Sequence, residues 1–257
     1  MTDRLHGRRI LVVGAGTRPS PEPDAPMGNG RAIAVLAARE GADVACADVD
    51  RAAAEETARL VEQEGAKAHV IVGDVTDPEV CRALVDETVA ALGGVDGLVL
   101  NVGIAAGRRL AETTVEQWDY TFAVNLRSHF LICQAALPVM AEGSAIVFIA
   151  SVAGISAGSQ IPSYDASKAG IFGLCRHVAL EGARKGVRAN VVAPGLIDTP
   201  LGRLATAGRP NRAKTPVPLG RQGTAEEIAA PVVFLLSNEA SYITSQVLAV
   251  DGGLSSR

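Results

Sequence analysis

The stretch Arg8-Arg9-Ile10-Leu11-Val12-Val13-Gly14-Ala15-Gly16-Thr17 decides the fold of this chain of 257 residues. Its apolar run, residues 10 to 13, is unbroken, which is typical of a central parallel strand buried on both faces. After an interruption, Gly28-Asn29-Gly30 opens an apolar helix over residues 31–40 that ends at Gly41. The stretch therefore predicts a buried strand, a glycine-rich turn and a helix.

The interruption is a segment of ten residues, 18 to 27, that contains four prolines. When it is set aside, the turn reads Gly14-x-x-x-Gly28-x-Gly30 between a strand and a helix. Glycines there let a pyrophosphate approach the backbone, and the N–H groups and dipole of the following helix bind anions. We therefore interpret the turn as a dinucleotide-binding loop that carries an insertion.

An acidic residue ends the next expected strand. Residues 43–47 form this strand, and Asp48 lies 18 residues beyond Gly30. A carboxylate at about this distance accepts hydrogen bonds from the adenosine ribose and repels a 2′-phosphate, which favours NAD over NADP. Arg18 and Arg31 are the counter-argument, because either guanidinium could reach such a phosphate.

Strand and helix patterns then alternate with short connections. We expect strands at 68–72, 97–100, 145–150 and 188–193, and helices at 51–64, 78–92, 115–141, from Tyr164 to about 185, and at 225–230. This order predicts an α/β fold with a doubly wound parallel sheet. No linker or internal repeat marks a second domain, so we expect one dinucleotide-binding catalytic domain over residues 1–257.

Polar residues and glycines stand where several of the expected strands end. They are Gly14, Asp48, Asp74, Asn101, Ser151 and Pro194. Ligands of doubly wound sheets bind beyond the carboxyl ends of the strands, so these residues are expected to line one site. Asp74 or Asn101 alone would more often be a loop residue or a cap.

The stretch from Ser163 to Lys168 is expected to form the first turns of a helix. Tyr164 and Lys168 are four residues apart and therefore share one face of that helix. A fixed ammonium beside a phenol favours the phenolate and lowers the pKa of the phenol, which makes a general acid/base usable near neutral pH. Taken alone, the pair is equally compatible with an ordinary surface Tyr and Lys.

Composition excludes several classes of function. Hydrophobic residues make up 48% and charged residues 20%, which is typical of a globular protein. The net charge of -4 argues against a nucleic-acid partner, and the apolar runs are too short for a membrane partner. The four cysteines and four histidines are scattered, so no metal site is expected. The first residues hold no apolar signal segment, so we expect a cytoplasmic protein.

Together these residues resemble the short-chain dehydrogenase/reductase family in its compact single-domain form, over nearly the whole chain. The motifs that carry the resemblance are the Gly14/Gly28/Gly30 turn, Asp74-Val75, Asn101-Val102-Gly103, Asn125, Ser151, Tyr164-x-x-x-Lys168, Pro194-Gly195 with Ile197 and Thr199, and Val250-Asp251-Gly252-Gly253. The family implies a Rossmann-type sheet of seven strands in the order 3-2-1-4-5-6-7, with helices on both faces.

The resemblance also implies roles for individual residues. Tyr164 would donate or accept the proton of the substrate oxygen, Lys168 would lower its pKa and hold the nicotinamide ribose, and Ser151 would position the substrate carbonyl or hydroxyl. Asn125 would hold a water that links Lys168 to solvent. Contacts to the dinucleotide are implied for Gly14, Thr17, Gly28, Asn29, Gly30, Asp48, Asp74, Val75, Asn101, Gly103, Tyr164, Lys168, Pro194, Ile197 and Thr199.

The implied function is an NAD(H)-dependent oxidoreductase that interconverts a secondary alcohol and a ketone by hydride transfer. Two alternatives stay open: a reductase of 3-oxoacyl thioesters on a carrier protein or coenzyme A, and a dinucleotide-binding sensor without turnover. The set Asn125, Ser151, Tyr164 and Lys168 favours an enzyme, because a sensor needs no proton donor beside the nicotinamide.

The chain departs from the family at two places. Asn101-Val102-Gly103 replaces the usual Asn-Ala-Gly, a local change that we expect to leave backbone contacts intact. The proline-rich insertion at 18–27 is expected to project, because its prolines favour extended geometry. It is either a tolerated surface loop, or a segment that folds over the adenosine half of the cofactor or touches a neighbouring subunit.

The segment from about 196 to 223 is expected to shape the substrate pocket. Its only acid is Asp198, and its bases are Arg203, Arg209, Arg212, Lys214 and Arg221. The basic bias suits an anionic substrate or a thioester carrier, but long surface loops are often basic without such a purpose. Relatives that act on carrier-bound ketones often place bases before the fifth strand, where this chain has Ala141-Glu142-Gly143-Ser144.

The expected helices 115–141 and 164–185 carry much apolar surface for outer helices, including Phe122, Leu126 and Phe130. In the family such helices pair between subunits, which implies a homotetramer, or else a dimer. The alternative is that these side chains all face their own sheet.

Overall fold

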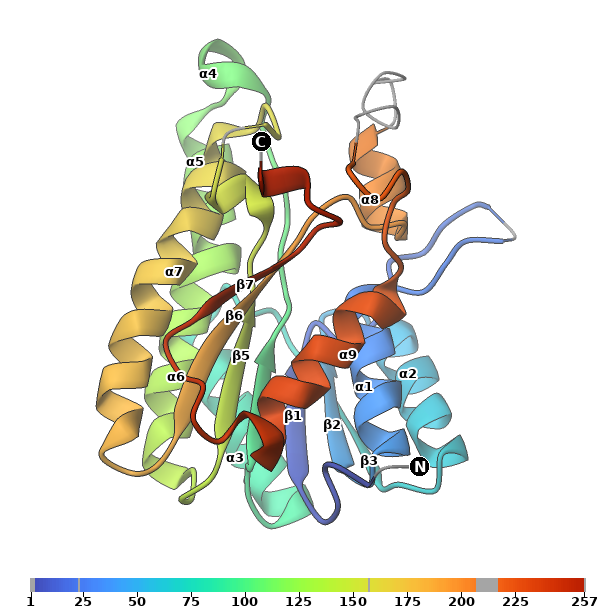
Figure 1. Ribbon diagram of the computed structural model, residues 1–257, viewed down its shortest axis with the longest axis vertical. Helices are drawn as coiled ribbons and strands as arrows, with labels where there is room; N and C mark the ends of the chain where they lie inside the picture. Colours follow the sequence, from blue (N-terminus) through green and yellow to red (C-terminus); the bar gives the residue numbers. More distant parts are fainter. Residues whose placement is uncertain (1–2, 23, 157, 207–216, 257) are drawn as a thin grey trace.

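The computed structural model describes residues 3–22, 24–156, 158–206 and 217–256. They form one parallel sheet of seven strands in the order β3-β2-β1-β4-β5-β6-β7 (Figure 1). The predicted doubly wound sheet and its strand order are confirmed. The strands are β1 Arg9–Val13, β2 Asp43–Asp48, β3 Ala68–Val72, β4 Gly97–Leu100, β5 Ala145–Ile149, β6 Arg188–Pro194 and β7 Val247–Val250.

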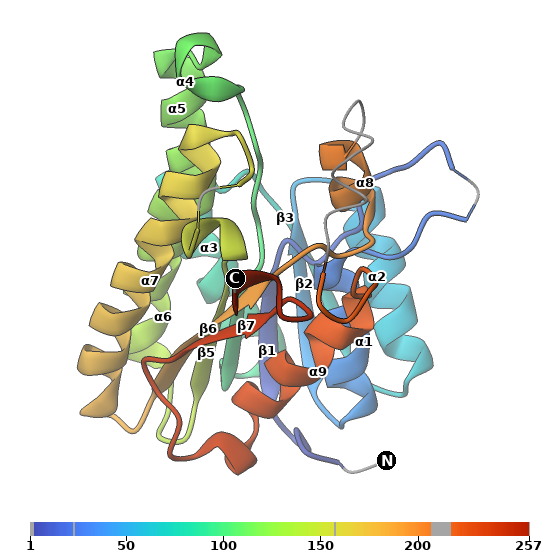
Figure 2. The same cartoon turned by 45° about the horizontal axis from the view of Figure 1, so that its top comes forward.

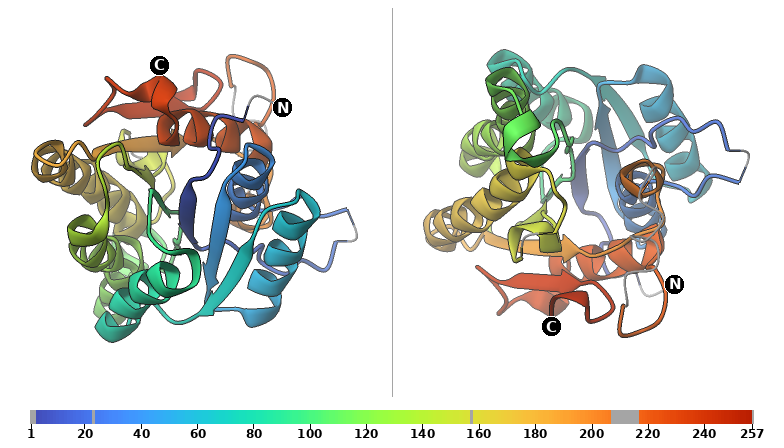
Figure 3. Two further views of the ribbon diagram at one scale, coloured as in Figure 1. Left: turned by 90° about the horizontal axis from the view of Figure 1, so that it is seen from below. Right: turned by 90° about the horizontal axis from the view of Figure 1, so that it is seen from above.

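Helices cover both faces of the sheet, as the end-on views of Figure 3 show. The α-helices are α1 Asn29–Arg39, α2 Arg51–Gln63, α3 Pro78–Leu92, α4 Arg109–Glu112, α5 Val115–Phe122, α6 Ser128–Val139, α7 Pro162–Ala183, α8 Pro200–Thr206 and α9 Ala225–Leu236. A π-helical turn, η1 Ala123–Arg127, joins α5 to α6, and a 3₁₀ turn, η2 Val152–Gly154, follows β5. The described part of the chain has no helix that is both long and apolar enough to span a bilayer.

The unbroken apolar sequence of β1 serves two cores. Successive residues of a strand point to opposite faces. Ile10 and Val12 therefore pack with α1, α2 and α9, whereas Leu11 and Val13 pack with α3, α6 and α7. All four side chains are at most 1% exposed. This burial on both faces fixes β1, and with it the start of the glycine-rich turn.

The expected single helix over 115–141 is divided in the structure by η1, at Asn125. A π turn inserts an extra residue and changes the direction in which side chains point. The side chain of Asn125 bonds to both the N–H and the carbonyl of Ile104, in the loop after β4. The π turn thus positions Asn125 for these two hydrogen bonds. The apolar pattern of the sequence does not indicate the π turn.

The expected substrate segment 196–223 contains a helix, α8, which the sequence did not predict. The bases Arg209, Arg212 and Lys214 lie outside the described residues. The other two pair with carboxylates: Arg203 with Asp198 and Glu22, and Arg221 with Glu227. Their charge is therefore partly neutralised within the chain.

Candidate active site

The carboxyl ends of the strands bring most of the predicted residues to one edge, which the right-hand view of Figure 3 faces. Gly14 follows β1, Asp48 ends β2, Asn101 follows β4, Ser151 stands just beyond β5, and Pro194 ends β6. The order of the strands reverses between β1 and β4. A crevice for ligands is expected at such a reversal.

Backbone atoms meet closely in the glycine-rich turn. Gly14 has φ +81°, and a Cβ atom there would lie 2.8 Å from the backbone nitrogen of Val102. A Cβ atom on Gly30 would collide with the carbonyl oxygen of Gly14 and lie 2.7 Å from Nδ2 of Asn101. That Nδ2 donates a hydrogen bond of 2.7 Å to the same carbonyl, so Asn101 ties the turn to the end of β4.

The turn leaves the start of α1 open to an anion. Its N-cap, Gly28, provides no side-chain cap, and the first turn of α1 holds no acidic residue. Oδ1 of Asn29 is buried and has no hydrogen-bond partner among the described residues. The backbone N–H of Gly28 donates 2.9 Å to Oγ1 of Thr17, which closes the base of the insertion. A glycine-rich turn at the N-terminus of a helix fits the pyrophosphate of a dinucleotide.

Asp48 supports the loop as well as facing it. Oδ2 accepts a hydrogen bond of 2.8 Å from the N–H of Gly16, and Oδ1 accepts one of 3.1 Å from the N–H of Asp50. A carboxylate has about four lone-pair sites, so further donors can still bind. Arg31, by contrast, donates to Thr57 and to the carbonyl of Ala53 on α2. Its guanidinium is thus turned toward α2.

The turn after β3 holds Asp74 and Val75. Oδ1 of Asp74 accepts a hydrogen bond of 2.9 Å from the N–H of Thr76, which is a turn contact. Val75 is buried in the core beside α3, and its carbonyl accepts from Sγ of Cys81. Both residues therefore have local structural roles, and the contacts to the dinucleotide that the resemblance implies for them stay a prediction.

Tyr164 and Lys168 lie in the first turns of α7, as predicted. Nζ of Lys168 is 5.7 Å from the centroid of the Tyr164 ring. Lys168 is 3% exposed, and its Nζ donates 2.9 Å to the carbonyl of Ile149 at the end of β5. Burial lowers the pKa of Lys168 from 10.5 to about 8. The ammonium is thus held inside the protein beside the phenol.

Ser151 is held next to this pair by the turn η2. Its Oγ accepts a hydrogen bond of 3.2 Å from the N–H of Ala153. At Gly154 a Cβ atom would lie 2.7 Å from the carbonyl carbon of Lys168 and 2.8 Å from the nitrogen of Ala169. Only glycine allows this approach, so η2 rests directly on the backbone of α7 at Lys168.

Asn125 is fully buried and fixes the loop after β4. Its Oδ1 accepts 2.8 Å from the N–H of Ile104, and its Nδ2 donates to the carbonyl of Ile104 and to Oγ of Ser167. Both donors of the amide are therefore used within the protein. A water between Asn125 and Lys168 would have to bind the backbone carbonyl of Asn125 or the remaining lone pair of Oδ1.

Gly103 lies against Lys168, because a Cβ atom at Gly103 would lie 3.0 Å from Nζ of Lys168. The backbone at Gly103 therefore passes close to the ammonium of Lys168. On the opposite side of the edge, Ile197 and Thr199 are buried after β6. Oγ1 of Thr199 accepts a hydrogen bond of 3.0 Å from the N–H of Gly202, which starts α8 beside the site.

Two residues near the site were not found from the sequence. Oγ of Ser167 donates a hydrogen bond to the carbonyl of Tyr164 and accepts one from Nδ2 of Asn125, so Ser167 joins α7 to η1. His129 is fully buried, and its ring interacts with the backbone of Val102. Burial and the charge of Lys168 lower the pKa of His129 from 6.5 to about 3. A scattered histidine on an apolar helix carries no pattern that points to a site.

Comparison with known proteins identifies the family. A family model described as enoyl-(acyl carrier protein) reductase matches residues 25–255. The 3-oxoacyl-(acyl-carrier-protein) reductase of Thermotoga maritima is 35% identical over 253 residues, which cover 98% of this chain and 99% of the relative. The L-rhamnose 1-dehydrogenase (NAD(P)+) of a Sphingomonas species is 35% identical over 257 residues, 97% of each chain. The crystal structure of levodione reductase superposes with a TM-score of 0.89, at 35% identity and 98% coverage of both chains.

The chain therefore belongs to the short-chain dehydrogenase/reductase family, which binds the nicotinamide cofactor NAD(P). It is an oxidoreductase that acts on CH–OH groups. The resemblance read from the motifs is confirmed.

Proposed function

We propose that the protein interconverts a secondary alcohol and a ketone with NAD(H), and that Tyr164 is the general acid/base. The observation that carries the proposal is the pair Tyr164 and Lys168, held against the Ser151 turn at the edge that bears the glycine-rich loop. The dinucleotide, when bound, supplies or accepts the hydride. Gly14, Gly28, Asn29 and Gly30 would hold its pyrophosphate.

The chain's own groups then supply orientation and the proton. In the oxidation direction the Tyr164 oxygen accepts the proton of the substrate hydroxyl, and in the reduction direction it returns a proton to the oxygen. The ammonium of Lys168 stabilises the Tyr164 phenolate, which is the base that accepts the proton in oxidation and the form left after proton donation in reduction. The hydroxyl of Ser151 positions the substrate oxygen by a hydrogen bond. Asn125 keeps the loop after β4 in place against Lys168.

NAD is the proposed coenzyme because Asp48 faces the glycine loop while Arg31 is bonded to α2. The kcat/KM for NAD should therefore exceed that for NADP. Asp48→Asn keeps an oxygen to accept from Gly16 but removes the charge that repels a 2′-phosphate. We expect it to raise the NADP/NAD ratio of kcat/KM about tenfold or more, since like charges cost more than about 1.4 kcal/mol. A wild-type preference for NADP would refute the assignment.

The second candidate substrate is a 3-oxoacyl thioester, which the similarity to the Thermotoga maritima reductase supports. The sequence Ala141-Glu142-Gly143-Ser144 before β5 offers no base for an acidic carrier protein. A panel of secondary alcohols and 3-oxoacyl thioesters, each assayed with NAD(H) and NADP(H) by nicotinamide absorbance, separates the candidates. Absence of turnover with every member, together with dinucleotide binding, would support a sensor instead.

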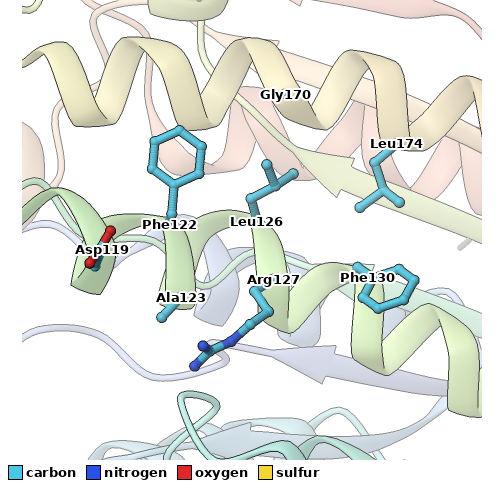
Figure 4. Close-up of a pocket in the computed structure, with 8 residues that line it drawn as sticks. All are labelled: Asp119, Phe122, Ala123, Leu126, Arg127, Phe130, Gly170 and Leu174. Carbon is cyan, nitrogen blue, oxygen red and sulfur yellow. The ribbon is translucent and has the colours of Figure 1, made fainter.

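We also propose a homotetramer, or else a dimer, formed by the outer helices. A hollow of about 520 Å³ lies between α5, η1, α6 and α7 and shares no residue with the predicted catalytic set. Figure 4 shows Phe122 and Leu126 directed toward α7, and Leu174 directed back from it. Phe130 on its rim is 46% exposed, which is unusual for an aromatic side chain without a partner surface.

Phe130→Asp should therefore weaken self-association. A buried aromatic at an interface typically contributes about 2 kcal/mol or more, so the dissociation constant of the assembly should rise about thirtyfold or more. Sedimentation or light scattering measures it. Leu110→Asp on the short helix α4, where the side chain is 85% exposed, is the control and should leave the mass unchanged. A monomeric wild-type protein would contradict the proposal.

A cytoplasmic location is proposed from the cysteines. All four are buried and unpaired. Burial raises the pKa of the Cys46 thiol to about 12 and that of Cys81 to about 11, which keeps both protonated and unreactive. Buried free thiols are typical of a reducing compartment.

A further inference from the structure

The proline-rich insertion touches the substrate segment. The carboxylate of Glu22, in the insertion, forms an ion pair with Nη1 of Arg203 on α8, 181 residues away in the sequence. Figures 1 and 2 both show the insertion, drawn in blue, beside α8, drawn in orange. The insertion therefore has a specific partner within the chain, which a tolerated surface loop does not require.

Arg203 carries the contact onward. Its Nε donates 2.7 Å to Oδ1 of Asp198 and its Nη2 donates 2.9 Å to Oδ2, while Nη1 is turned to Glu22. The two carboxylates raise the pKa of the Arg203 guanidinium further above its ordinary value. The planar guanidinium thus holds one carboxylate with two parallel bonds and a second carboxylate at Nη1.

The two segments that this network joins both adjoin residues of the predicted cofactor site. Asp198 stands between Ile197 and Thr199, for which the family resemblance implies contacts to the nicotinamide carboxamide. The backbone N–H of Asp198 donates a 2.9 Å hydrogen bond to the carbonyl of Gly223. At the other end, the insertion leaves from the glycine loop, where the pyrophosphate is expected. The ion pair therefore links the loop expected at the pyrophosphate to the segment that follows β6.

The insertion is also braced at its base. The N–H of Gly28 donates to Oγ1 of Thr17, which closes the loop across the ten inserted residues. Met27 packs against the core formed with α1 and α9. The backbone N–H of Glu22 donates a 3.2 Å hydrogen bond to Oγ of Ser20, and the carbonyl of Glu22 accepts one of 3.2 Å from the N–H of Ala25. Prolines reduce the freedom that such a loop loses on ordering, which favours a preformed shape.

We propose that the insertion and α8 form a strap across the bound dinucleotide, and that the ion pair between Glu22 and Arg203 fastens it. The dinucleotide then leaves only after this pair opens, so the pair slows dinucleotide release and ties it to the movement of α8. This inference rests on the proposed function, since it takes the crevice to hold NAD(H). The term strap is kept below for residues 18–22, 24–27 and α8 together.

The strap predicts a faster release of NADH when the ion pair is removed. Glu22→Gln keeps the size of the side chain and removes its charge. Ion pairs that are partly exposed, like this one, typically change an equilibrium by about fivefold or less, and networks by more. We therefore expect the dissociation rate constant of NADH to rise about fivefold, measured by stopped-flow displacement with excess NAD and without substrate. Asp24→Asn, an exposed acid of the same insertion, is the matched control and should leave the rate unchanged.

Two further measurements separate the ion pair from a general loosening of the loop. Arg203→Gln and the double variant with Glu22→Gln complete a double-mutant cycle. Arg203→Gln also removes the two bonds to Asp198, but in that variant Glu22→Gln should have no further effect, because the pair it would break is already absent. Raising the ionic strength should speed release from the wild type and have little effect on Glu22→Gln, since salt screens a partly exposed pair. A fully additive cycle would contradict the proposal.

The same experiment distinguishes this inference from the proposed function. If Glu22→Gln and Asp24→Asn both release NADH at the wild-type rate while turnover with an alcohol is intact, the strap is wrong and the oxidoreductase stands. If both variants release NADH equally faster, the effect is that of net charge and the strap is again wrong. If the wild-type protein binds no nicotinamide dinucleotide, both proposals fall together.

Discussion

Replacing Tyr164 by Phe is expected to lower kcat about 10²- to 10⁴-fold, the usual contribution of a positioned general acid or base. The phenyl ring keeps the shape of the side chain and its place beside Lys168, whose Nζ lies 5.7 Å from the ring centroid. Only the hydroxyl that carries the proton is lost. The affinity for NAD(H) should stay close to that of the wild type, because the glycine-rich loop and α1 are untouched.

Steady-state kinetics with an active alcohol, together with a titration of NADH fluorescence, test both halves of this expectation. Tyr120→Phe is the matched control: the same atom is removed from a tyrosine on α5 that is 52% exposed. It should leave kcat unchanged. A Tyr164→Phe enzyme with an unimpaired rate would refute Tyr164 as the acid/base, whereas a loss of NADH binding would assign the hydroxyl to the cofactor site instead.

The sequence predicts the frame of this site because the frame depends on strong local patterns. The apolar run of β1 must be buried on both faces, and Gly14 and Gly30 stand where backbones meet too closely for a side chain. Parallel strands place their carboxyl ends on one edge, so the sequence alone assigns Asp48, Asn101 and Ser151 to one crevice.

The remaining features depend on contacts between distant residues, which no local pattern encodes. The π turn at Asn125 follows from a hydrogen bond to Ile104, and a smooth apolar periodicity hides it. The ion pair between Glu22 and Arg203 joins two segments that are 181 residues apart in the sequence. Taken alone, each of these two residues is an ordinary charged residue at the surface. Short elements such as α8 are likewise fixed by tertiary contacts rather than by propensity.

Replacing Lys168 by Met is expected to abolish measurable activity and, at the same time, to stabilise the cofactor-free protein. Burial is the cause of the lowered pKa of Lys168, from 10.5 to about 8, so at pH 7 the protein holds a charged ammonium that is 3% exposed. A shift of this size corresponds to a cost of about 3 kcal/mol for keeping the charge inside. Methionine has a similar length and no charge.

The difference in the free energy of unfolding between Lys168→Met and the wild type should depend on pH. The folded protein releases the proton of Lys168 near pH 8 and the unfolded chain near pH 10.5, so the cost is absent above 10.5 and complete below about 8. The free energy of unfolding of Lys168→Met should thus exceed that of the wild type by about 1–3 kcal/mol at pH 7, after allowance for the lost bond to Ile149. The difference should shrink as the pH rises from 8 to 10.5.

Urea denaturation at pH 7 and at pH 10 measures this difference, with Lys67→Met, an exposed lysine, as the control that should show no such pH dependence. A Lys168→Met protein less stable than the wild type at pH 7 would mean that the ammonium is solvated or paired, and not merely buried. A more stable but inactive variant would show that the site keeps a costly buried charge for catalysis, since a residue selected for stability alone would be apolar here.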